Sequence, residues 1–159
     1  MINTTQKIRP WLWFVDQAEE AANFYVSVFK NSRITNISRY GEGGPGPAGS
    51  VMVATFELDG CQFMALNGGS SENYSSAFYV DCETQEEVDR YWEMLSQGGE
   101  PGACGWLKDR YGVSWNIVPS EFGEMMEDDD DEKTGRMFEA MLGMQKLDIA
   151  KLRAAFEGR

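Results

Sequence analysis

The sequence contains no histidine, and this absence excludes several kinds of chemistry. A Ser-His-Asp triad, a histidine general base and a histidine-ligated metal site all require an imidazole. Any acid or base in this chain must therefore be Asp, Glu, Lys, Tyr or Cys.

Cysteines, positive charge and long apolar runs are also scarce. The three cysteines, Cys61, Cys82 and Cys104, form no CxxC motif and are odd in number, so they predict no disulfide framework. No apolar run approaches the roughly 18 residues of a membrane span, and the N-terminus lacks the pattern of a signal peptide. The net charge of −12 disfavours a nucleic-acid partner. We expect a cytoplasmic protein without a membrane or nucleic-acid partner.

The first half of the chain reads as one βαβββ module. Apolar residues at helical spacing follow Asp16, which has Glu19 three residues later, the spacing of a capping box. Asp59-Gly60 separates two alternating runs and predicts a hairpin turn. The predicted elements are strand 8–15, helix 16–30, strand 32–40, a Gly/Pro loop at 41–50 and hairpin 50–67.

The second half repeats this order after a polar linker at Asn67 to Ser75. Thr84 and Glu87 again have capping-box spacing at the start of a helix. The predicted elements are strand 76–82, helix 84–99 and three short strands within 100–104, 105–109 and 113–119. Each module pairs a helix with one face of a sheet, so the other face needs a cover. We expect the two modules to cover one another around a concave space.

The acidic run Glu127 to Lys133 precedes the tail and predicts a solvated helix cap, because consecutive acids do not converge on one metal ion. Two helices are predicted after it, with apolar stripes typical of a core or an interface. The stripes consist of Met137, Ala140, Met141 and Met144, and of Ile149, Leu152 and Phe156.

Aromatic residues make up 13% of the chain, and some of them are candidates for a ligand site. Trp11 and Trp13 alternate with Leu12 and Phe14; we assign the tryptophans to the concave space, with two core tryptophans as the alternative. Ser114 and Asn116 form the polar side of the last strand. Asn116 either meets a ligand or satisfies backbone groups of a neighbouring strand. The other candidates are Met64, Asn67 at the rim, and Tyr79. For Tyr79, the alternative to a ligand contact is a hydroxyl whose hydrogen bonds are already satisfied at a sheet edge.

Three further residues have simpler structural interpretations. For Asp109, a role in shaping the turn before the last strand is favoured over a role as a general base. Cys82 and Cys104 have no histidine to activate them, so we expect buried structural thiols.

Six stretches together resemble the PhnB-like family of the glyoxalase/bleomycin-resistance/dioxygenase, or vicinal-oxygen-chelate, superfamily. They are WFVDQAEEAANFYVSVF, GPGPAGSV, ALNGG, CETQEEVDRYW, CGWLKDRYGVSWNIVP and AMLGMQKLDIAKL, and they span about residues 8 to 155. The resemblance implies an α+β fold of two paired βαβββ modules with a C-terminal helical hairpin, and often a homodimer. It divides the chain into a glyoxalase-like domain, 1–120, with modules 8–67 and 75–119, and a tail, 121–159.

The resemblance also implies where a metal would bind. Superfamily enzymes place His, Glu or Gln ligands at positions that correspond to Arg9 or Pro10, Met64, Ser75 to Ala77, and Asn116. None of these is His or Glu, so we expect no metal and no cofactor. Some members carry the label 3-demethylubiquinone-9 3-methyltransferase. Methyl transfer is not expected here, because no glycine-rich loop follows the first strand.

Three functions remain open. The first is binding of a small apolar or aromatic molecule without a metal. The second is a lyase, isomerase or dioxygenase with unusual metal ligands such as Glu57, Glu72 or Asp81. The third is sequestration of a cationic antibiotic of the bleomycin type, which the acidic charge favours. Whether the chain is an enzyme is left undecided.

Overall fold

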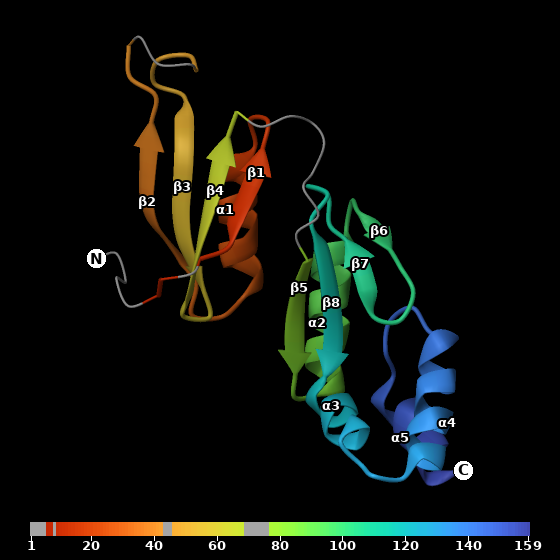
Figure 1. Cartoon of the computed structure of the whole chain (residues 1–159). Helices are drawn as coiled ribbons and strands as arrows, with labels where there is room; N and C mark the ends of the chain where they lie inside the picture. The colour runs from red at the N-terminus through yellow and green to blue at the C-terminus, as the bar shows by residue number, and fades with distance from the viewer. Residues whose placement is uncertain (1–5, 8, 43–45, 69–76) are drawn as a thin grey trace. The chain divides into compact units, whose positions relative to one another are not determined.

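A computed structural model of the chain describes residues 6–7, 9–42, 46–68 and 77–159. The chain divides into two compact units, residues 1–76 and 77–159, and the elements of each are drawn in Figure 1. Most of the predicted linker between the modules lies outside the described residues. Among the described helices, none is both long enough and apolar enough to cross a bilayer.

The first unit is a four-stranded sheet with one helix, as predicted. Its strands have the order β1-β4-β3-β2; β1 and β4 are parallel and the other pairs are antiparallel. Asp59 and Gly60 have φ angles of 47° and 82°, the positive values that a tight two-residue hairpin needs. The elements are β1 (Trp11–Phe14), α1 (Ala18–Val28), β2 (Arg33–Arg39), β3 (Val51–Leu58) and β4 (Cys61–Asn67).

Helix α1 covers one face of this sheet and forms the core of the unit with it. Tyr25 is fully buried and stacks on Phe56, with 6.2 Å between ring centroids. Phe56 in turn stacks on Phe63 at 5.6 Å. Figure 1 shows the helix lying behind β1 and β4 in this unit.

The prediction that Asp16 caps α1 is wrong. The residue at the cap position is Gln17, and its side chain makes no capping hydrogen bond. Instead, the backbone amide of Ala18 donates to Oδ1 of Asn67 at 2.8 Å. The last residue of β4 therefore supplies the acceptor that the free helix amides require.

The second unit repeats the first. Its strand order is β5-β8-β7-β6, with β5 and β8 parallel, so the internal repeat of topology is confirmed. Thr84 caps α2, because its hydroxyl accepts from the amide of Glu87 at 3.2 Å. The elements are β5 (Ala77–Cys82), α2 (Gln85–Ser96), β6 (Glu100–Pro101), β7 (Trp106–Lys108) and β8 (Ser114–Pro119).

Three helices follow β8 where the sequence predicts two. They are α3 (Ser120–Met126), α4 (Asp131–Leu142) and α5 (Ile149–Glu157). Sequence reasoning missed α3, a seven-residue helix whose Phe122 and Met125 are partly buried against the cluster of the tail. The predicted cap of α4 is confirmed, since Asp130 accepts from the amides of Glu132 and Lys133.

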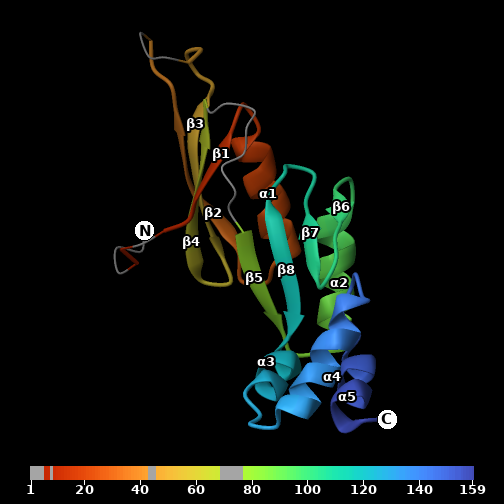
Figure 2. The ribbon, with the colours of Figure 1, turned by 45° about the vertical axis from the view of Figure 1, so that its right-hand side comes forward.

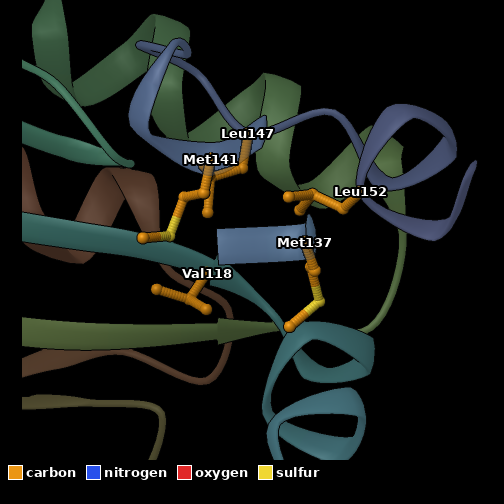
Figure 3. Close-up of a cluster of buried hydrophobic side chains, with 5 residues drawn as sticks. All are labelled: Val118, Met137, Met141, Leu147 and Leu152. Atoms are coloured by element: carbon orange, nitrogen blue, oxygen red, sulfur yellow. The ribbon is translucent and has the colours of Figure 1, made fainter. Parts of the chain in front are cut away.

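The apolar stripes of α4 and α5 pack within the second unit. They form a buried cluster with the end of β8 (Figure 3), which consists of Val118, Met137, Met141, Leu147 and Leu152. In Figures 1 and 2, α3, α4 and α5 gather at the end of this sheet where β5 and β8 finish. The predicted stripes are therefore core of this unit.

Candidate functional site

Each sheet has a face that its own helix does not cover, and we call these two surfaces the open faces. On the first sheet, Trp11 and Trp13 are 43% and 41% exposed, whereas Leu12 and Phe14 are 2% and 5% exposed. Trp11 and Trp13 therefore lie on the face opposite to Leu12 and Phe14, and their assignment to a concave space stays a prediction. Alternation along a strand explains this separation, because successive side chains point to opposite faces.

Register places apolar neighbours beside both tryptophans. Trp11 is paired with Met64, and Trp13 with Leu66, on the adjacent β4. Met64 and Leu66 are only partly buried, and paired residues share a face. This part of the open face is therefore a flat aromatic and thioether surface.

Asn67 does not lie on the open face, although we predicted it at the rim of the site. Its side chain is 9% exposed and has the parity of the residues that face α1. Oδ1 accepts from the amide of Ala18, and Nδ2 donates to the carbonyl of Val51 at 3.1 Å. Its amide group is committed to the fold, so we leave it out of the proposed site.

Gln62 is a polar residue that sequence reasoning missed. It lies two residues before Met64, is fully buried, and neither polar atom of its side chain has a hydrogen-bond partner among the described residues. Its backbone is satisfied: Gln6 Oε1 accepts from its amide at 2.8 Å, and Gln6 Nε2 donates to its carbonyl at 3.2 Å. No sequence signal marks this residue, because nothing local shows that the polar position becomes buried.

On the second sheet, three candidates form one row across the strands. Tyr79 of β5 is paired with Asn116 of β8, and Asn116 is paired with Trp106 of β7. Tyr79 is 61% exposed and Trp106 is 44% exposed. Two aromatic side chains therefore flank one amide on the open face, and Ser114 lies in the adjacent row.

The amide of Asn116 is oriented by one hydrogen bond. Its Nδ2 donates to the carbonyl of Cys104 at 3.3 Å. A carbonyl can only accept, so the nitrogen must be the atom that faces Cys104. Oδ1 has no hydrogen-bond partner in the part of the chain that the structure describes. Both interpretations of Asn116 are thus compatible with one side chain: one end satisfies a backbone carbonyl and the other is free.

Tyr79 has a hydroxyl that remains protonated at neutral pH. Desolvation, and after it the neighbouring Asp81 carboxylate and Cys82, raise the pKa of Tyr79 above its ordinary value. Asp81 accepts a hydrogen bond from the Ser120 hydroxyl at 2.7 Å. The phenol can therefore donate to a ligand but is a poor base.

Asp109 has the structural role that the sequence predicts. Its Oδ1 accepts from the amides of Tyr111 and Val113 at 2.8 and 3.0 Å. Its Oδ2 accepts from Nε1 of Trp115 at 2.8 Å, and the side chain is 3% exposed. A carboxylate with three buried donors is a structural acceptor.

The cysteines differ in accessibility. Cys82 is fully buried, as predicted, and burial, followed by the charges of Glu87 and Asp81, raises the pKa of its thiol to about 12. Cys104 is partly buried and Cys61 is exposed. All three are free thiols.

The residues at the positions of the superfamily metal ligands do not fit a divalent ion. A proline or arginine, a thioether, a serine or alanine and a neutral amide lack the imidazole or carboxylate donors that such ions prefer. In the described ranges, no three His, Cys, Asp or Glu side chains gather as a metal site. Of the unusual ligands considered, Glu57 pairs with Arg33 at 3.2 Å, Asp81 binds Ser120, and Glu72 lies outside the described residues.

Comparisons with known proteins agree with this fold. The family model described as 3-demethylubiquinone-9 3-methyltransferase matches residues 6–118. A PhnB protein from Bacillus cereus is 41% identical with a TM-score of 0.66, over 72% of this chain and 99% of that one. Protein PA1353 from Pseudomonas aeruginosa is 20% identical, with a TM-score of 0.60 over 72% and 98% of the two chains.

A more distant likeness shows the fold alone. The fosfomycin resistance protein FosX from Listeria monocytogenes is 18% identical with a TM-score of 0.56, over 80% of this chain and all of its own. No curated protein matches the chain.

Proposed function

Because this chain belongs to the 3-demethylubiquinone-9 3-methyltransferase-like (PhnB) family of the glyoxalase superfamily, we propose that it binds a small, flat aromatic molecule on the open faces of its sheets, without a metal ion. The observation that carries the proposal is the row of Tyr79, Asn116 and Trp106 on the second sheet. Two exposed rings with an amide between them suit a ligand that has an apolar body and one polar group.

The first sheet supports the same ligand chemistry. Trp11 and Trp13 remain about two-fifths exposed on a strand whose other residues are buried. Large exposed apolar side chains that gather on one surface are typical of a binding site. Met64 beside Trp11 adds a polarizable thioether, which makes favourable contacts with aromatic rings.

Methyl transfer is not part of the proposal, although the family model bears that name. The common methyltransferase fold binds its cofactor at a glycine-rich loop after the first strand of a parallel sheet. Here β1 is followed by Val15, Asp16 and Gln17, and the sheet is mixed.

A second candidate is sequestration of a cationic aromatic antibiotic of the bleomycin type. The net charge of −12 and the exposed Asp81 near Tyr79 favour a positive ligand. This candidate shares the aromatic surfaces with the first and differs only in the charge of the ligand.

The first experiment is native mass spectrometry of the protein as purified from cells. We expect an organic mass on the chain and no stoichiometric metal. A stoichiometric metal would instead favour the lyase, isomerase or dioxygenase function with unusual ligands.

The second experiment measures binding to four naphthalene derivatives by calorimetry: 2-naphthol, 2-methoxynaphthalene, 1-naphthylmethylammonium and 2-naphthoate. Trp13→Ala and Trp106→Ala should each weaken the tightest of them about tenfold, the effect of losing a large aromatic contact. Phe138→Ala is the control, because this ring is 43% exposed but lies on α4. If none of the four binds, or if the control weakens binding equally, the proposal fails. Preference for the ammonium would favour the second candidate.

A further inference from the structure

We infer that the C-terminal extension, residues 120–159, positions the Asn116 amide and so sets which polar group a ligand can present to it. The inference rests on the proposed function. The extension lies outside the family match, which ends at residue 118, and 72% of this chain already accounts for 99% of the Bacillus cereus relative. The extension is therefore additional to the part of the chain that the family model matches, although its stretch AMLGMQKLDIAKL resembles the family.

The extension holds the turn before β7 through two backbone hydrogen bonds. The amide of Cys104 donates to the carbonyl of Met144 at 2.9 Å, and the amide of Gly105 donates to the carbonyl of Gln145 at 2.8 Å. Met144 and Gln145 belong to the connection between α4 and α5, which we call the α4–α5 link (residues 143–148).

Two side-chain contacts join the α4–α5 link to α2, and the first is made by Gln85. Gln85 Nε2 donates to the carbonyl of Leu147 at 3.0 Å, and Gln85 Oε1 accepts from the amide of Ile149 at 2.8 Å. Because both the nitrogen and the oxygen of this side-chain amide are hydrogen-bonded to the link, Gln85 fixes the position of the link relative to α2. Lys146 adds an ion pair to Asp89 of α2 at 2.9 Å.

The turn that the link holds has an unusual backbone. Cys104 and Gly105 have φ angles of 59° and 81°, and the amide of Trp106 donates to the carbonyl of Ala103 at 3.1 Å. A residue other than glycine rarely adopts the left-handed conformation of Cys104. The two hydrogen bonds to the link stabilise this conformation and thereby fix where the Cys104 carbonyl points.

The Cys104 carbonyl accepts from Nδ2 of Asn116, and Oδ1 is left as an acceptor with no partner among residues 6–7, 9–42, 46–68 and 77–159. The chain of contacts thus runs from Gln85 through the α4–α5 link and Cys104 to Asn116. A ligand that lies between Tyr79 and Trp106 would then be favoured if it carried an O–H or N–H donor.

The extension also ends the open face next to Asn116. Val118 has the parity of Ser114 and Asn116, yet it is only 3% exposed. It packs in the cluster with Met137 and Met141, as Figure 3 shows. The face is therefore open at Asn116 and closed two residues later.

The test compares the Asn116 side-chain amide in three full-length, ¹⁵N-labelled proteins by NMR: wild type, Gln85→Ala and Thr84→Ala. Thr84→Ala is the matched control, because it removes the cap of the same helix without touching the link. In wild type and in Thr84→Ala, we expect the chemical shift of one Nδ2 proton to depend less on temperature than that of the other, because only one of them is hydrogen-bonded. In Gln85→Ala, we expect the two protons to show the same temperature dependence.

Either of two results would overturn the inference: an unchanged Asn116 amide in Gln85→Ala, or an equal change in Thr84→Ala, which would show a general effect of stability. Should Gln85→Ala fail to fold, Gln85→Glu replaces it, since a carboxylate keeps the acceptor for Ile149 and loses the donor to Leu147. There, too, we expect the hydrogen-bond signature of Asn116 to weaken.

Binding selectivity gives a second readout that a purely structural role would not change. Wild type should prefer 2-naphthol to its methyl ether by roughly two- to tenfold, the net value of one hydrogen bond. In Gln85→Ala the ratio should fall toward one, and in Thr84→Ala it should not. If wild type binds none of the four naphthalene derivatives, the proposed function fails, while the NMR comparison still decides the positioning role.

Discussion

At the residue scale, Asp109 organises the turn that leads into β8. Its two carboxylate oxygens accept from Tyr111, Val113 and Trp115, all of which are less than 10% exposed. Water cannot easily replace an acceptor at such a buried position. The carboxylate thus supports the strand that carries Ser114 and Asn116.

Asp109→Ala should lower the free energy of unfolding by about 3 kcal/mol, because it leaves three buried donors without their acceptor. Urea denaturation measures this. Asp59→Asn is the control: Asp59 is exposed with a positive φ that asparagine also tolerates, so we expect a change within about 0.5 kcal/mol. Equal losses in both variants would contradict the role of Asp109.

Gln62 should behave in the opposite way. Gln62→Met replaces a buried side-chain amide that lacks partners among the described residues, and it should raise the free energy of unfolding by about 1 kcal/mol. Gln6→Met, which removes two hydrogen bonds to the Gln62 backbone, should lower it by a similar amount. A clear destabilisation by Gln62→Met would show that water or a ligand completes its hydrogen bonds.

The thiols should react in an order set by burial. Only the thiolate is a nucleophile, and the Cys82 pKa of about 12 keeps this thiol protonated below that pH. At pH 8, iodoacetamide should therefore modify the exposed Cys61 and leave Cys82 intact, as peptide mass mapping would reveal. In urea all three cysteines should react. Equal rates for Cys61 and Cys82 in the native protein would refute this order.

At the scale of elements, local sequence patterns predict the βαβββ order. Each pattern predicts one element independently of the rest: alternation for β1 and β8, helical stripes for α1 and α2, and Asp59-Gly60 for the hairpin turn. The cap of α1 could not be predicted in this way. Its acceptor is Asn67, which is distant in the sequence and reaches the helix only after β4 pairs with β1.

The turn at Cys104-Gly105 should be sensitive to small changes. A Cβ on Gly105 would lie 2.9 Å from the carbonyl oxygen of Ile117, and its φ of 81° is unfavourable for alanine. We expect Gly105→Ala to lower the free energy of unfolding by at least about 2 kcal/mol. Gly135→Ala on α4, where a Cβ meets nothing within 4 Å, should raise it by up to about 1 kcal/mol. Thermal unfolding compares the two, and a tolerated Gly105→Ala would contradict the tight packing of this turn.

At the scale of the whole molecule, the tail completes the second unit. The described residues of 77–159 form one compact unit in which α4 and α5 bury Val118. The apolar stripes of the tail therefore find their partners in their own chain. The family resemblance still predicts a homodimer, and the tail is the part of the chain we expect to matter for it.

A chain that ends at Pro119 should lose solubility or the dimer, because Val118 would lose its apolar cover. Size-exclusion chromatography with light scattering measures both properties. A chain that ends at Glu157 keeps all of α5 and is the control, for which we expect no change. A soluble chain ending at Pro119 with the mass of the full-length assembly would disprove this prediction.

The sequence by itself determined the α+β class and the repeated module, because periodicity and short turn motifs are local properties. The family followed from the resemblance of six stretches of residues. Only the tertiary structure decided the row of Tyr79, Asn116 and Trp106, since register between strands is a non-local property. It also removed Asn67 from the open face, revealed buried Gln62 and linked the tail to Asn116 through Cys104. The local sequence around a residue does not predict a hydrogen bond to a residue that is distant in the sequence, because only folding brings the two partners together.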